Sequence, residues 1–151
     1  MRRECGILSA TAFLLVACGG GGEEPREPEA ALRHTLETYN AALAEGDWET
    51  ACNEMAPEFI HISREGMREN GVADPPKSCP EMWKRSVSEG LTDARLLTDA
   101  SEDARFDGAE VTGATARIDF SQYLSDRGRS AMTAYARRDD DGQWRITQVT
   151  S

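Results

Sequence analysis

The spacing of apolar residues changes from a helical to a strand repeat near Gly90, and this change limits the fold more than any other feature of the sequence. Before Gly90, apolar residues recur every three to four positions, as in an amphipathic helix. After it they recur at every second position, as in a strand with one buried face. Helices followed by antiparallel strands predict the α+β class. The apolar face of such a sheet needs a cover, so we expect the helices to pack on it.

The first helix is predicted over residues 30–45 by a stripe of apolar residues at helical spacing, formed by Leu32, Leu36, Tyr39 and Leu43. Gly46 is the expected stop of this helix. Asp47 is then the expected N-cap of a second helix, which begins at Trp48 and carries its own apolar stripe. Pro57 is expected either to end this helix or to open a short third one.

Residues 64–77 are polar and rich in Gly and Pro, so they are predicted to form a loop. A further helix is expected after Ser78, because the spacing of Ser78 and Glu81 matches a capping box. This helix carries Cys79, Met82, Trp83 and Val87 on one face and is expected to end near Gly90.

Five strands are predicted after Gly90. Their expected bounds are residues 92–98, 103–112, 114–123, 130–138 and 143–150. Asp107-Gly108 interrupts the second strand, and Val149 is out of phase with the apolar face of the last, which indicates a bulge or a frayed end. Turns are expected at residues 125–128 and 139–142. The second turn is acidic but lacks the spacing of a calcium-binding loop.

The first 18 residues resemble the leader of a bacterial lipoprotein. Met1-Arg2-Arg3 is basic, and residues 7–17 form an apolar segment of signal-peptide length, too short to span a bilayer. The sequence Leu15-Val16-Ala17-Cys18 then resembles a lipobox. This resemblance implies that residues 1–17 are removed and that the thiol of Cys18 is acylated. An ordinary signal peptide and a soluble secreted product are the alternative.

Lipidation implies export and attachment to the outer face of the bacterial plasma membrane, because two or more acyl chains hold a protein firmly to a bilayer. Residues 18–29 are rich in Gly, Glu and Pro and are predicted to form a flexible tether. Residues 30–151 remain as one α+β domain. Loss of residues 1–17 shifts the formal net charge from −10 to −11. So acidic a domain repels phosphate backbones, and we expect no nucleic-acid partner.

Two of the four cysteines are unassigned after these steps, since Cys5 leaves with the signal peptide and Cys18 carries the lipid. Cys52 and Cys79 are then expected to form a structural disulfide in an oxidising compartment. A redox-active or metal-binding pair is the alternative. Neither cysteine belongs to a C-x-x-C motif, however, and no histidine lies at ligand spacing beside them. We therefore expect no metal ion and no cofactor.

Two short motifs resemble the nuclear transport factor 2-like family, which includes ketosteroid isomerases and SnoaL-like polyketide cyclases. The first motif is A-L-x-x-G-D-W-x-x-A-C, from Ala42 to Cys52, and the second is D-G-Q-W-R-I-T-Q-V, from Asp141 to Val149. The resemblance covers about residues 30–151. It implies a cone, in which a strongly curved antiparallel sheet wraps a long helix and leaves a cavity at the wide end. It does not by itself imply an activity.

Enzymes of this family use a carboxylate or histidine as a general base in the cavity, with a Tyr or an acid that stabilises an oxyanion. No residue of this chain matches the family's base. Asp47 is explained as a helix cap, and Asp119 falls on the polar face of its strand. His34 lies on the flank of the first helix. His61, between two isoleucines, is the histidine placed best for a cavity mouth, although a backbone-bonded histidine is the commoner arrangement.

The sequence thus favours a non-catalytic binding or accessory domain of the cell envelope. Its cavity would hold a small apolar ligand, or its sheet would dock an envelope protein. The expected cavity residues are Tyr39, His61, Trp83 and Phe120, although core packing also explains the three aromatic ones. An enzyme of the isomerase, cyclase or dehydratase type is the main alternative. A structural envelope protein that acts through oligomerisation is the third.

Overall fold

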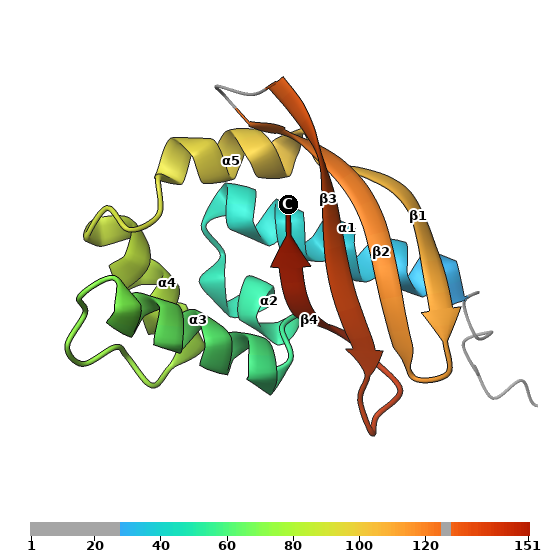
Figure 1. Ribbon diagram of the computed structural model, residues 1–151, viewed down its shortest axis with the longest axis horizontal. Coiled ribbons are helices and arrows are strands. Elements are labelled where there is room, and N and C mark those ends of the chain that lie inside the picture. The colour runs from blue at the N-terminus through green and yellow to red at the C-terminus, as the bar shows by residue number, and fades with distance from the viewer. Residues whose placement is uncertain (1–27, 125–127) are drawn as a thin grey trace, which may run out of the picture.

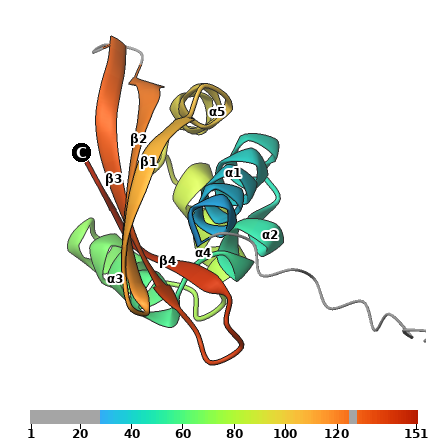
Figure 2. The ribbon, with the colours of Figure 1, turned by 90° about the vertical axis from the view of Figure 1, so that its right-hand side faces the viewer.

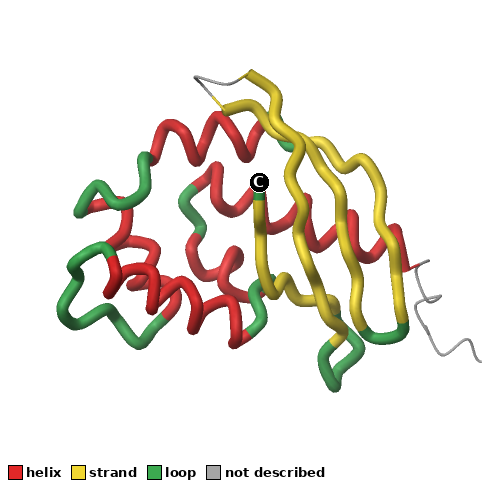
Figure 3. The backbone as a smooth tube through the Cα atoms, viewed as in Figure 1, coloured by secondary structure: helices red, strands yellow, loops and turns green. Residues whose placement is uncertain are grey.

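The computed structural model describes residues 28–124 and 128–151, which form five helices followed by four strands (Figure 1; Figure 3). The helices are α1 (Pro28–Glu45), α2 (Trp48–Asn53), α3 (Pro57–Glu69), α4 (Cys79–Ser88) and α5 (Ala94–Glu102). The strands are β1 (Arg105–Thr112), β2 (Thr115–Leu124), β3 (Gly128–Arg138) and β4 (Trp144–Thr150). The predicted α+β class is confirmed.

Helices α1 and α5 lie on one side of the sheet, which Figure 2 shows on edge. The predicted stripe of α1 faces the sheet, and all four of its residues are buried. Leu32 and Leu36 belong to the same core cluster as Ile118 of β2 and Ile146 of β4. These four side chains are the largest fully buried ones among the described residues. Burial of each stabilises the fold by about 1.5–3 kcal/mol, so the contact between helix α1 and the sheet contributes strongly to stability.

The sheet is an antiparallel meander in the order β1-β2-β3-β4. Alternate residues of β2 and β3 face the helices, as predicted. Ala116, Ile118 and Phe120 of β2 are buried, and so are Ala134 and Ala136 of β3. The residues between them, such as Thr115, Arg117 and Tyr135, face away from the helices and are exposed.

Two bulges interrupt the ladder where irregularities were predicted. Asp107 is the extra residue between the pairs Phe106–Phe120 and Gly108–Asp119. Thr147 is the extra residue in β4, because Gln148 pairs with Tyr135 while Ile146 pairs with Ala136. The second bulge returns Val149 to a half-buried position against the core. Bulges bend the strand and increase its twist.

The strand predicted over residues 92–98 is wrong, because this segment begins helix α5. Asp93 caps the helix: its Oδ1 accepts hydrogen bonds from the backbone N–H groups of Arg95 (2.9 Å) and Leu96 (3.2 Å). Leu97 and Ala100, three residues apart, then pack toward the core. The cap and this helical spacing outweigh the weak alternation of the segment. The sheet accordingly has four strands in the described residues.

The loop predicted over residues 64–77 begins too early, because α3 continues to Glu69. Met67 packs into the core with 6% of its surface exposed, which anchors the last turns of the helix. Gly66 lies inside the helix without a positive φ, so it does not break it. The loop after the helix is held by Arg64, whose Nε donates a hydrogen bond to the carbonyl oxygen of Pro76 (3.0 Å).

Of the two predicted N-caps, the one at Asp47 is confirmed and the capping box at Ser78 is wrong. Asp47 caps α2: its Oδ1 accepts from the backbone N–H of Thr50 (3.1 Å) and its Oδ2 from the Thr50 hydroxyl (2.7 Å). Ser78 is the N-cap residue of α4, but its side chain makes no capping hydrogen bond, so the reciprocal capping box is wrong. A proline, Pro80, lies in the first turn of α4.

The N-terminal boundary of the folded part differs slightly from the prediction. Helix α1 begins at Pro28, so the last two residues of the expected tether are helical. Residues 1–17 and Cys18 lie outside the described residues, as do residues 125–127 of the predicted turn. The turn at Asp139 is present, and Asp139 Oδ1 accepts from the backbone N–H of Asp141 and of Gln143. None of the helices in the described residues is both long and apolar enough to cross a membrane.

Candidate functional site

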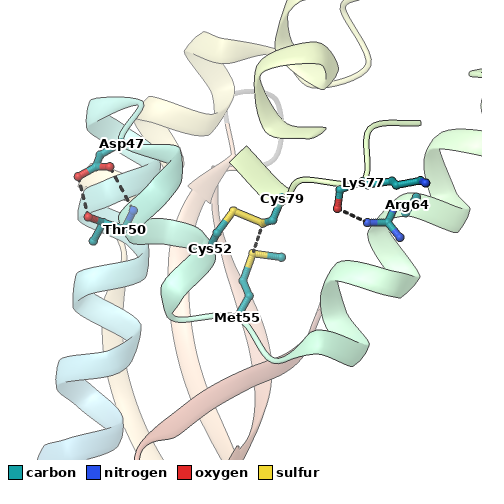
Figure 4. Close-up of a disulfide and its surroundings, with 7 residues drawn as sticks. All are labelled: Asp47, Thr50, Cys52, Met55, Arg64, Lys77 and Cys79. Carbon is teal, nitrogen blue, oxygen red and sulfur yellow. Dashed lines mark hydrogen bonds between the residues drawn. A yellow bond between two sulfur atoms is a disulfide. The ribbon is translucent and has the colours of Figure 1, made fainter. Parts of the chain in front are cut away.

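A disulfide joins Cys52 of α2 to Cys79 of α4, as predicted (Figure 4). The Cα atoms of the two cysteines are 6.0 Å apart, and 27 residues separate them in the sequence. Met55 Sδ lies 4.0 Å from Cys79 Sγ. This is a packing contact, because a disulfide sulfur has no hydrogen to donate. The bridge fixes α4 against α2, and α4 carries the side chain that separates the two cavities described next.

A core cavity of about 140 Å³ lies where α1, α4 and α5 meet strands β2 and β4. Three of the four predicted cavity residues line it: Tyr39 of α1, Trp83 of α4 and Phe120 of β2. The fourth, His61, is exposed on α3 and is not part of this lining. The remaining lining residues are Asn40, Leu43, Leu97, Ala100, Ser101, Gln122 and Val149.

The core cavity has an apolar wall with a few neutral polar groups. These polar groups are the Tyr39 phenol, the Asn40 and Gln122 amides and the Ser101 hydroxyl. Its lining includes no carboxylate, amine, guanidinium or imidazole group. Burial raises the pKa of Tyr39 above its usual value, so the phenol stays neutral and serves as a hydrogen-bonding group. The cavity is therefore suited to an uncharged molecule with one or two polar atoms.

The sequence analysis missed three polar lining residues, Asn40, Ser101 and Gln122. Asn40 is buried one position after Tyr39, and it lies four residues after Leu36 and three before Leu43, so it shares their helix face. A polar residue on the same helix face as the apolar stripe of α1 was the sequence signal that could have identified Asn40 as a lining residue. Ser101 is buried on α5, and the strand predicted for the start of that helix concealed its position. Gln122 lies on β2 in the same alternation as Ile118 and Phe120, so its inward direction could be read from the strand period.

A second cavity of about 240 Å³ lies between α3 and α4. Its apolar wall is formed by Met67, Met82, Trp83 and Leu91, and its polar wall by Ser63, Asn70, Ser86 and Thr92. Gly66 completes the lining. The Ser86 and Thr92 hydroxyls are 2.6 Å apart and bonded to one another. This α3–α4 cavity, like the core cavity, has no charged residue in its lining.

Trp83 stands between the two cavities and is the one residue common to both linings. Its indole stacks on that of Trp48, with ring centroids 5.9 Å apart and an angle of 11° between the planes. The Trp83 Nε1–H group is buried and has no hydrogen-bond partner. A buried donor left unpaired costs about 1–3 kcal/mol, so this arrangement of the indole is not its best-satisfied one.

The acids and histidines considered for catalysis lie elsewhere. Asp47 caps α2, and hydrogen bonds from the Thr50 hydroxyl and backbone lower its pKa. Asp119 lies on the outer face of the sheet, 3.0 Å from Arg117. His34 is exposed on α1. Within residues 28–124 and 128–151, no group of three or more His, Cys, Asp or Glu side chains is placed to hold a metal ion.

No protein-family model matches this chain, and no curated protein matches it. Among solved structures, it is similar to the solution structure of a SEC-C motif containing protein from Rhodopseudomonas palustris. The two sequences are 15% identical, and the match covers 82% of this chain and 77% of that one, with a TM-score of 0.40. A likeness this distant carries no information about function.

Proposed function

We propose that this protein is an exported, lipid-anchored binding domain whose core cavity takes a small neutral molecule. The observation that carries the proposal is the lining of the cavity, which combines an apolar wall with neutral phenol, amide and hydroxyl groups. Such a site binds by burial of apolar surface and orients its ligand with a few hydrogen bonds. The helix-covered, bulged sheet is compatible with a cone of the nuclear transport factor 2-like kind, and we include that fold in the proposal.

The volume of the core cavity limits the size of this ligand. A cavity of about 150 Å³ is large enough to hold a benzene ring, and the core cavity is of similar size, about 140 Å³. A single ring that carries a hydroxyl or carbonyl group suits it. A charged ligand does not, because no countercharge is available in the lining and burial of an unpaired charge is costly.

The proposed location is the outer face of the bacterial plasma membrane. It is supported by the leader and lipobox that end at Cys18 and by the Cys52–Cys79 disulfide, a bond typical of oxidising compartments. Labelling with a radioactive fatty acid should mark the wild-type protein and fail to mark Cys18→Ala. A label that survives this substitution would contradict the anchor and leave the cavity proposal intact.

An isomerase or cyclase is supported less well. The neutral Tyr39 phenol is able to donate a hydrogen bond to a developing oxyanion, as such enzymes require. A general base must also lie within hydrogen-bond reach of the substrate. The lining of the core cavity offers neither a carboxylate nor an imidazole for this purpose. Binding without catalysis is therefore the better-supported function.

Titration with cyclohexanol, a neutral ring with one hydroxyl, tests the binding proposal. A ligand that binds only the folded state raises the Tm, so we expect Tm to rise with cyclohexanol concentration for the wild type. Ala100→Leu places a larger side chain in the cavity wall and should reduce the rise. Ala94→Leu makes the same change at an exposed position of α5 and should retain it. Equal responses of the two variants would refute the proposed site.

A further inference from the structure

The core cavity and the α3–α4 cavity have one side chain in common. Trp83 belongs to both linings, and no other residue does. Its indole stacks on that of Trp48, and its Nε1–H group makes no hydrogen bond. Rotation of the Trp83 side chain therefore breaks no hydrogen bond of the indole. In a new position, the Nε1–H group can donate a hydrogen bond to an acceptor.

The sizes of the two cavities point to a shared ligand. Separately they measure about 140 and 240 Å³, and each is smaller than an ordinary small-molecule site. Together they reach the lower part of the range of about 300–1,000 Å³ that such sites occupy. Displacement of the Trp83 indole would join them at the position that its side chain now occupies.

The chemistry of the two linings is alike. Neither contains an Asp, Glu, Lys, Arg or His residue. The core cavity is mainly apolar. The α3–α4 cavity is more polar, because its lining includes the Ser63 and Asn70 side chains and the hydrogen-bonded hydroxyls of Ser86 and Thr92. A molecule that spans both would place an apolar ring in the core and a more polar end between the helices.

We infer that Trp83 is a movable partition, and that its displacement creates one elongated site for an extended neutral amphiphile. The ligand carries an oxygen acceptor that accepts a hydrogen bond from Trp83 Nε1–H. This inference rests on the proposed function, because it takes the core cavity as a ligand site. It goes further in naming a longer ligand class and the residue that admits it.

The test uses the full chain and two neutral probes. Cyclohexanol is small enough for the core cavity, and the fluorophore Prodan is a longer naphthalene ketone that we expect to extend from the core cavity into the α3–α4 cavity. Wild-type protein should bind both probes. Gly66→Leu fills the α3–α4 cavity from inside helix α3, where a Cβ meets no atom within 4 Å. It should weaken Prodan binding at least tenfold and leave cyclohexanol binding unchanged.

Gly66→Ala is the matched control, since it makes the same glycine replacement with a side chain too short to block the cavity. It should bind both probes like the wild type. Probe that dissolves in the N-terminal leader contributes equally to all variants and cancels in the comparison. Trp83→Phe removes the indole N–H and keeps an aromatic ring. It should weaken Prodan binding about fivefold more than it changes cyclohexanol binding, the effect of one lost hydrogen bond.

A second measurement follows Trp83 directly. The Nε1–H resonance of Trp83, identified by its loss in Trp83→Phe, should move downfield when Prodan binds and shift less when cyclohexanol binds. If the wild type binds cyclohexanol but not Prodan, or if Gly66→Leu binds Prodan like Gly66→Ala, the movable partition is refuted while the proposed function stands. If the wild type binds neither probe, both proposals fail.

Discussion

Cys52 in α2 and Cys79 in the first turn of α4 are joined by a disulfide, with their Cα atoms 6.0 Å apart. The bond ties α4, and with it Trp83, to the helix that carries Trp48. Each cysteine packs against the same apolar core. The disulfide thus sets the geometry of the wall between the two cavities as well as the stability of the domain.

Removal of both sulfur atoms should destabilise the protein. The bridge closes a loop between residues 27 positions apart, and in the chain-entropy model a loop of this length is worth about 3–4 kcal/mol. We expect the double variant Cys52→Ala, Cys79→Ala to lose about this free energy of unfolding, measured by urea denaturation. Reduction of the wild type should have a similar effect. Free thiols at both positions in non-reduced wild-type protein would contradict the assignment.

Replacement of Gly66 by alanine should stabilise the protein. Gly66 lies inside α3, its φ is not positive, and a Cβ there meets no atom within 4 Å. Alanine in a helix interior is favoured over glycine by about 1 kcal/mol. The urea midpoint of Gly66→Ala should therefore exceed that of the wild type at unchanged slope. Gly71→Ala, at a φ of 92°, is the contrasting control and should lower the midpoint.

Gly66 also explains why the end of α3 could not be predicted. Gly66 is the one residue of 64–69 that disfavours a helix, whereas the arginine, glutamate and methionine residues around it have good helix propensity. Burial of the Met67 side chain stabilises the helical conformation of this segment. That burial depends on the position of α4, which cannot be predicted from the local sequence. In contrast, the strict alternation of β2 and β3 predicted which residues face the core, because one buried face imposes a period of two along the whole strand.

The candidate site was only partly accessible from the sequence for the same reason. Tyr39, Trp83 and Phe120 each lie on a predicted inward face, and the structure brings them to one cavity. His61 was placed by its isoleucine neighbours, but the continuation of α3 leaves it exposed. Helix α5 supplies Ala100 and Ser101 to the wall. The helical spacing of the apolar residues in α5 can be recognised only when Asp93 is identified as the N-cap of a helix and not as part of a strand.

Asp47 should make the stability of the protein depend on acid pH. Hydrogen bonds from the Thr50 hydroxyl and backbone lower the pKa of Asp47, so its stabilising effect is present above the unfolded value of about 3.9 and is lost as the pH falls through the folded value. Asparagine caps helices equally well but does not titrate. Asp47→Asn should match the wild type at pH 7 and become the more stable of the two in acid.

Urea midpoints measured from pH 7 down to pH 2 would check this difference. Asp47→Ala, which removes the cap altogether, should be less stable than both proteins at pH 7. Parallel curves for the wild type and Asp47→Asn over the whole range would show that the Asp47 carboxylate does not gain its hydrogen bonds on folding.

Tyr39 should make the protein lose stability at alkaline pH. Burial raises the pKa of the Tyr39 phenol above its unfolded value of about 10. The unfolded chain therefore releases this proton first, and the stability present below pH 10 is lost as the pH rises, by at most about 1.4 kcal/mol per pH unit. Tyr39→Phe should flatten this branch of the curve. Tyr135→Phe, at an exposed site on the outer face of the sheet, is the matched control and should retain it. An equally steep alkaline branch in Tyr39→Phe would mean that the phenol reaches water and does not form a neutral wall of the cavity.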